Sequence, residues 1–164
     1  MNEGLIPNAR AYALARQFQI AEILGSGKDG IVLVGNSPLY PAKIAIKAHL
    51  FTEMYWREKR VYERLTGSAI TSVMGFNVPR FLGSDDNRLV LEMTIVERPF
   101  VLDFAGAYLD TRPEFPGEIW ADWEADKREQ FEERWPMVRK VMDAFEELGI
   151  YLLDVSSNNI AFID

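Results

Sequence analysis

Apolar residues alternate with polar ones over several short runs in the first half of the chain, which is typical of β-strands. A 16-residue segment, 52–67, instead has apolar side chains at helical spacing, with Thr52 as the predicted N-cap and Gly67 as the predicted residue after the helix. Five strands are predicted, three before this helix and two after it: 18–27, 30–35, 42–50, 78–83 and 87–96. The first two are joined by a glycine-rich turn and should form a hairpin.

The second half of the chain has a helical pattern. Residues 97–118 contain prolines and no clear period, and we interpret them as a linker. Residues 119–135 are strongly charged, with aromatic residues that indicate a surface helix. A further helix is predicted over 136–148, because proline is tolerated in the first turn of a helix and Gly149 is typical of a helix end. We expect its apolar stripe to pack against a partner surface, either the charged helix at 119–135 or a second copy of the chain.

Composition narrows the class of protein. The chain has 164 residues, 48% of them hydrophobic, which fits one globular domain spanning 1–164. A net charge of −7 argues against general nucleic-acid binding. With no cysteine and one histidine, disulfides and a site of several imidazoles are excluded. The first residues lack the apolar core of a leader and no run approaches a membrane span, so we expect a cytoplasmic protein.

The glycine-rich turn is a candidate phosphate-binding loop. A Walker A loop would need lysine and then serine or threonine after its last glycine, but Gly30 is followed by Ile31. A dinucleotide fingerprint would open a helix, whereas these glycines open a strand. A glycine hairpin whose amides cover phosphates remains, formed by Gly25, Gly27 and Gly30 with Val32 packed on a base. A plain structural turn is the alternative.

Lys47 and Glu58 form a candidate ion pair. Lys47 projects from the strand face opposite Ile44 and Ile46. Glu58 lies inside the apolar stripe of the 52–67 helix, where a buried carboxylate requires a partner. Lys47 is the nearest candidate, although a solvated lysine and a carboxylate at the rim of the stripe are the alternatives.

These features together resemble the eukaryotic-like protein kinase superfamily, roughly over residues 20–164. The resemblance rests on five landmarks in the family's order: the glycine hairpin, "IAIK" with Lys47, "REKRVYERL" with Glu58, "LVLEMT", and "LLDVSSNN". It implies an α+β fold: a kinase-like N-lobe at 15–97, with a five-stranded antiparallel sheet and one helix, and a linker with a reduced, mostly helical C-lobe at 98–164.

The resemblance also implies roles for named residues. Lys47, held by Glu58, would position the phosphates of ATP, and Asp154 would be the catalytic-loop aspartate. Asn159 would bind Mg²⁺, and backbone groups of Glu92 and Thr94 would face the adenine. The implied activity is phosphoryl transfer to a hydroxyl of a protein or a small molecule.

The sequence also departs from the family's pattern. Leu152 and Leu153 replace the usual His-Arg before the aspartate, and Ser156 replaces a common lysine. No Asp-Phe-Gly motif follows Asn159, and Asp164 is a weak substitute as a metal ligand. The alternative is therefore an inactive kinase-like module that binds nucleotide or serves as an interaction surface.

Overall fold

A five-stranded antiparallel sheet forms the first half of the molecule. The computed structural model describes residues 4–27 and 29–163. The strand order is β1-β2-β3-β7-β6, and every neighbouring pair is antiparallel. The bounds are Gln19–Ser26 for β1, Gly30–Asn36 for β2, Ile44–His49 for β3, Phe81–Asp85 for β6 and Val90–Thr94 for β7. The five predicted strands are confirmed, with ends that differ by a few residues.

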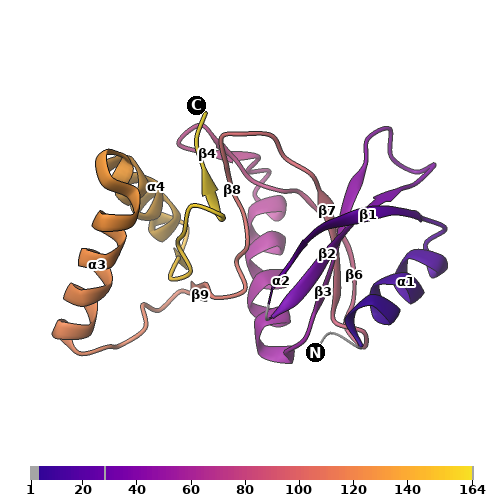
Figure 1. Cartoon of the computed structure of the whole chain (residues 1–164), viewed down its shortest axis with the longest axis horizontal. Helices are drawn as coiled ribbons and strands as arrows, with labels where there is room; N and C mark the ends of the chain where they lie inside the picture. Colours follow the sequence, from indigo (N-terminus) through magenta and orange to yellow (C-terminus); the bar gives the residue numbers. More distant parts are fainter. Residues whose placement is uncertain (1–3, 28, 164) are drawn as a thin grey trace.

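Two helices lie on opposite faces of this sheet (Figure 1). The predicted helix is α2, Thr52–Gly67. A second helix, α1 (Leu5–Ala15), was not predicted and packs on the other face, over Leu33, Ile44 and Ile46. Two of its four buried residues are alanines, so it has no wide apolar stripe that would reveal it in the sequence.

The predicted caps of α2 are wrong by one or two positions. Phe51 is the N-cap, Thr52 is the first helical residue, and no side chain caps this end. At the other end Gly67 is still helical and Ser68 is the C-cap. Ala69, with φ of 56°, takes the left-handed conformation that glycine would adopt more easily.

The segment interpreted as a linker is ordered by short strands. Phe100–Val101 (β8) pairs with Ile160–Ala161 (β11), and Tyr108–Leu109 (β9) pairs with Ile150–Tyr151 (β10). Strand β8 also continues a small sheet through β5 (Phe76–Asn77) to β4 (Ser72–Val73). The linker interpretation did not include these pairings, because two-residue strands leave no periodic pattern.

The helices of the second half agree with the sequence pattern. They are α3 (Gly117–Phe131), a 3-10 turn at Glu132–Arg134, and α4 (Trp135–Glu147), with Pro136 in the first turn of α4. Gly149, with φ of 76°, follows the end of α4. No helix in the described part of the chain is long and apolar enough to cross a membrane.

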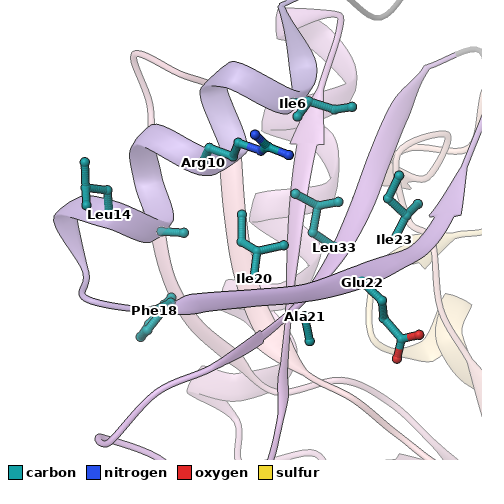
Figure 2. Close-up of a pocket in the computed structure, with 10 residues that line it drawn as sticks. Ile6, Arg10, Leu14, Phe18, Ile20, Ala21, Glu22, Ile23 and Leu33 are labelled. Atoms are coloured by element: carbon teal, nitrogen blue, oxygen red, sulfur yellow. The ribbon is translucent and has the colours of Figure 1, made fainter.

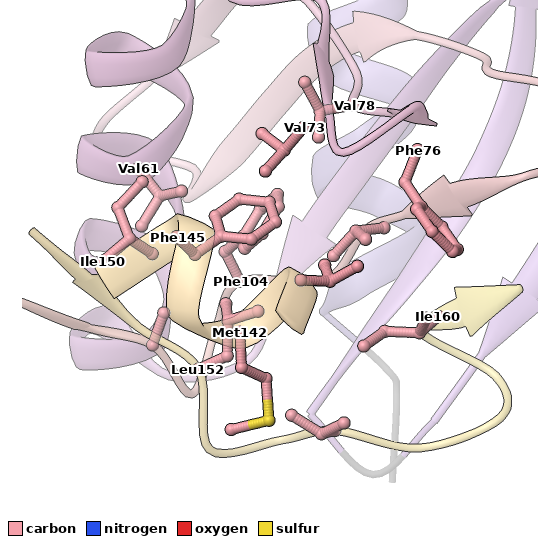
Figure 3. Close-up of a cluster of buried hydrophobic side chains, with 14 of the residues drawn as sticks. Val61, Val73, Phe76, Val78, Phe104, Met142, Phe145, Ile150, Leu152 and Ile160 are labelled. Atoms are coloured by element: carbon pink, nitrogen blue, oxygen red, sulfur yellow. The ribbon is translucent and has the colours of Figure 1, made fainter. Parts of the chain in front are cut away.

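The apolar stripe of α4 is buried within this chain. Val138, Val141, Met142 and Phe145 are at most 4% exposed. Figure 3 shows Met142 and Phe145 beside Phe104 and close to Val61 of α2. Helix α3 contributes the buried ring of Phe131, which stacks on Trp135, and an edge contact between the rings of Trp123 and Trp135. The stripe is thus covered within this chain, in the apolar cluster that α4 shares with α2, α3 and the ordered connection.

A groove of about 530 Å³ lies between α1 and β1. Figure 2 shows Ile6, Arg10 and Leu14 of the helix above Ile20 and other residues of the strand. Leu33 lines this groove from the α1 face, whereas Lys47 belongs to the opposite face of the sheet. The groove is therefore separate from the residues that the sequence singles out for chemistry.

Candidate functional site

Lys47 and Glu58 form the predicted ion pair. Lys47 Nζ lies 2.7 Å from Glu58 Oε1, and the two side chains are 13% and 0% exposed. Strand alternation turns Lys47 toward α2, and Glu58 meets it from the buried face of that helix. Val32 is the cross-strand neighbour of Lys47 and so shares its face. The alternatives of a solvated lysine and a rim carboxylate are excluded.

Glu58 accepts hydrogen bonds from three directions. Besides Lys47, its Oε1 lies 2.6 Å from His49 Nε2. Its Oε2 accepts a 2.7 Å hydrogen bond from the backbone N–H of Phe104. Every buried polar side-chain atom of the described residues has a partner, so this carboxylate is buried at no loss of hydrogen bonding.

The charged groups in this cluster shift one another's pKa values. Burial alone would raise the pKa of Glu58, but the Lys47 charge and the His49 hydrogen bond lower it to about 2. Burial would likewise lower the pKa of Lys47, and the charges of Glu58 and Asp103 raise it instead. Both groups are therefore ionised at neutral pH.

This pairing predicts a loss of stability in acid. Because the pKa of Glu58 is about 2 in the folded state and 4.5 is its ordinary value, its contribution is complete above about pH 4.5 and is lost as the pH falls through 2. The loss should be on the order of 3 kcal/mol of unfolding free energy. Urea unfolding at pH steps between about 4.5 and 2 should show this loss of unfolding free energy in the wild type. The Glu58→Gln variant should not show it. Parallel pH profiles for the two proteins would contradict the prediction.

Asp103 is a site residue that the sequence did not reveal. Its Oδ1 lies 3.1 Å from Lys47 Nζ, and its backbone has φ of 69°. The next residue, Phe104, donates its N–H to Glu58, and its ring makes an edge contact with Tyr62 at 5.3 Å. The letters "DFAG" at 103–106 were a possible indication. They were missed because an acidic residue was sought only after Asn159.

Asp154 and Asn159 lie on the loop between β10 and β11. Asn159 Nδ2 donates a 2.8 Å hydrogen bond to the backbone carbonyl of Asp154, which closes this loop. A Cβ at Gly106 would lie 3.2 Å from the Cβ of Asp154, so the 103–106 turn packs directly against the loop. Partial burial, followed by the Asp103 charge, raises the pKa of Asp154, while Lys127 of α3 lowers it. Asp164 lies outside the described residues.

The glycine turn joins β1 and β2 as predicted. Gly27 donates its N–H to the Gly30 carbonyl, at 3.0 Å. A Cβ at Gly25 or Gly27 would meet no atom within 4 Å, so these two leave open space beside the turn. Gly30 is different, because a Cβ there would lie 2.7 Å from the Ala48 carbonyl oxygen. Its lack of a side chain is required by the packing of β2 against β3.

Glu92 and Thr94 lie inside the sheet. Glu92 pairs with Ile46 on one side and Gly83 on the other. Its side chain is buried on the α1 face, where its Oε1 accepts hydrogen bonds from Tyr12 and Arg16 at 2.6 and 3.1 Å. Thr94 donates its backbone N–H to the backbone carbonyl oxygen of Arg80, at 3.0 Å. The backbone of Glu92 lies between two paired strands and the N–H of Thr94 is already used, and their contact with adenine stays a prediction.

The turn at 103–106 and the loop at 152–159 carry side-chain oxygens of the type that divalent cations bind. Asp103 and Asp154 offer carboxylate oxygens and Asn159 an amide oxygen, and Mg²⁺ prefers oxygen ligands. Within 4–27 and 29–163, no three His, Cys, Asp or Glu side chains are grouped closely enough to hold a metal by themselves. Such a site would need oxygens from a ligand, as Mg²⁺ sites with nucleotides commonly do.

Comparison with known proteins finds structural likenesses and no match by sequence. The sequence matches no protein-family model, and no curated protein matches it. The structure is similar to the crystal structure of the Mycobacterium tuberculosis PknI kinase domain, with a TM-score of 0.42 and 19% sequence identity. The match covers 84% of this chain and 51% of that one, so the chain spans about half the length of that kinase domain.

Proposed function

We propose that this chain binds ATP with Mg²⁺ and transfers the terminal phosphoryl group to a hydroxyl. The observation that carries the proposal is the buried Lys47 ammonium, which two carboxylates, Glu58 and Asp103, hold from different segments. A lysine fixed in this way, on the same face as Val32 and the open glycine turn, suits the phosphates of a nucleotide. The order of the sequence landmarks supports the same reading.

Each residue has a defined role in the proposed reaction. Lys47 and the backbone amides of the glycine turn hold the phosphates. Asp103 and Asn159 hold Mg²⁺, which neutralises charge on the phosphates when it is bound. Asp154 orients the acceptor hydroxyl and accepts its proton as the oxygen bonds to phosphorus and the bond to ADP breaks. The raised pKa of Asp154 suits it to accept that proton.

A module that binds nucleotide without turnover is the second candidate. It is favoured by the metal geometry, because no three acidic or imidazole groups cluster among the residues that the structure describes. A weakly held Mg²⁺ would permit binding and slow the chemistry. The two candidates share the same binding residues and differ in turnover alone.

Titration calorimetry with ATP and Mg²⁺ tests binding. We expect Gly27→Val to weaken the affinity by about tenfold or more, because its side chain would occupy the space that phosphates need. Gly67→Val is the matched control, since a Cβ at either glycine meets no protein atom within 4 Å and Gly67 lies at the end of α2. Absence of binding to the folded wild type would overturn both candidates.

Release of ADP from ATP, with water as the acceptor, then separates the two candidates. We expect Asp154→Asn to bind ATP as the wild type does and to lose at least about 100-fold in turnover. Binding without measurable turnover in the wild type would select the second candidate. Equal turnover in the two proteins would remove Asp154 from the mechanism.

A further inference from the structure

His49 is a buried group with no role in the function proposed above. It is the one histidine of the chain and is 2% exposed. Its position at the end of β3 places it two residues after Lys47 and therefore on the same strand face. The ring lies edge-on to that of Tyr55, with centroids 5.5 Å apart, which fixes the plane of the imidazole between α2 and the sheet.

Both ring nitrogens of His49 face hydrogen-bond acceptors. Nε2 lies 2.6 Å from Glu58 Oε1, and Nδ1 lies 3.2 Å from the backbone carbonyl oxygen of Leu89. A backbone carbonyl has no proton to give, and Glu58 is ionised because Lys47 and the Phe104 N–H bind the same carboxylate. A ring that meets two such acceptors satisfies both by donating from both nitrogens.

We propose that His49 is a positioning residue, which as an imidazolium holds the Glu58 carboxylate in place for Lys47 and for the Phe104 N–H. Charge balance supports this inference. Lys47 and His49 then carry two positive charges against the two negative charges of Glu58 and Asp103. Without the imidazolium, the cluster would hold one excess negative charge, shared between the fully buried Glu58 and the partly exposed Asp103.

The function of this contact is to connect the sheet with the turn at residues 103–106, which carries Asp103 and is called the acidic turn below. His49 and Lys47 both bind Oε1, which leaves Oε2 directed toward Phe104. The position of Phe104 in turn sets that of its neighbour Asp103, which contacts Lys47 at 3.1 Å. His49 thus acts on the site through Glu58 without touching a ligand itself. That the position of Asp103 then affects nucleotide binding rests on the proposed function.

The protonation of the two ring nitrogens of His49 can be measured without any ligand. Because the chain has one histidine, a two-bond ¹H–¹⁵N correlation spectrum contains a single imidazole. In the folded protein at neutral pH, we expect both ring nitrogens to have the shift of protonated nitrogen. One nitrogen with the shift of an unprotonated, accepting site would overturn the proposal.

Two variants separate positioning from simple packing. Glutamine places its amide N–H near Nε2 and can still donate to Glu58, whereas asparagine reaches only toward Nδ1. We expect His49→Gln to keep the wild-type amide shift of Phe104, and His49→Asn to lose it. Affinity for ATP with Mg²⁺ should stay within about twofold in the former and fall about tenfold in the latter.

The outcomes are distinguishable. If both variants are folded by thermal unfolding and keep the Phe104 shift, His49 does not position Glu58 and the inference is wrong. If the Phe104 shift changes as expected but the wild type binds no ATP, the proposed function fails while the role of His49 in the cluster stands.

Discussion

Replacing Lys47 with methionine is expected to lower the free energy of unfolding by about 4 kcal/mol. The substitution keeps most of the apolar volume of the side chain but removes the ammonium that lies 2.7 Å from Glu58. Breaking a buried ion pair by removing one partner typically costs about 3–5 kcal/mol, because the remaining charge loses an opposite charge in direct contact. Urea unfolding at neutral pH measures the change.

Arg128→Met is the matched control for this experiment. Arg128 pairs with Glu124 at 3.0 Å, but its side chain is 65% exposed. Exposed pairs contribute on the order of 0.5 kcal/mol, so this variant should remain close to the wild type. A loss below about 1 kcal/mol in Lys47→Met would show that Glu58 does not depend on Lys47 in the folded protein.

Truncating Phe145 to alanine is expected to cost about 4 kcal/mol and also to disturb the acidic turn. Phe145 is fully buried on α4, and its ring centroid lies 5.7 Å from that of Phe104 (Figure 3). Removal of a buried phenylalanine leaves a cavity that typically costs about 3–5 kcal/mol. Because Phe104 then loses a ring contact, its amide resonance should move as well. Chemical denaturation measures the loss of stability, and the amide shift of Phe104 measures the disturbance of the acidic turn.

Met137→Ala provides the comparison on the same helix. Met137 is 40% exposed, so its truncation removes little packed volume and should cost less than about 1 kcal/mol. If Phe145→Ala were equally mild, or if it left the Phe104 amide unchanged, the apolar cluster would not support the acidic turn.

Sequence periodicity was sufficient to predict most of the sheet and the Lys47–Glu58 pair. Alternation along β3 determines the face of Lys47, and helical spacing determines the face of Glu58, so each partner is implied by its own segment. Helix α1 was missed because alanines form much of its contact surface. The surroundings of Glu92 were missed for a related reason, since its hydrogen-bond donors, Tyr12 and Arg16, come from that unassigned region.

Asp103 could not be placed from local pattern. Its neighbours in space, Lys47 and Asp154, lie 56 and 51 positions away along the chain, and the strands that bring the segments together have two residues each. Periodicity describes single elements and says nothing of pairings between such short ones. The resemblance also directed attention to residues after Asn159, whereas the structure places the second carboxylate before it in the chain.

The pairing of β8 with β11 has a consequence for the order in which the molecule assembles. Lys47 and Glu58 are 11 residues apart, so their contact closes a short loop and can form while the second half of the chain is still being synthesised. The strands at 100–101 and 160–161 must close a loop of about 60 residues, which has a larger entropic cost and requires the later segment to be present. We therefore expect the lysine–glutamate pair to form early during biosynthesis. The acidic turn becomes fixed beside Asp154 only after residue 161 has emerged from the ribosome.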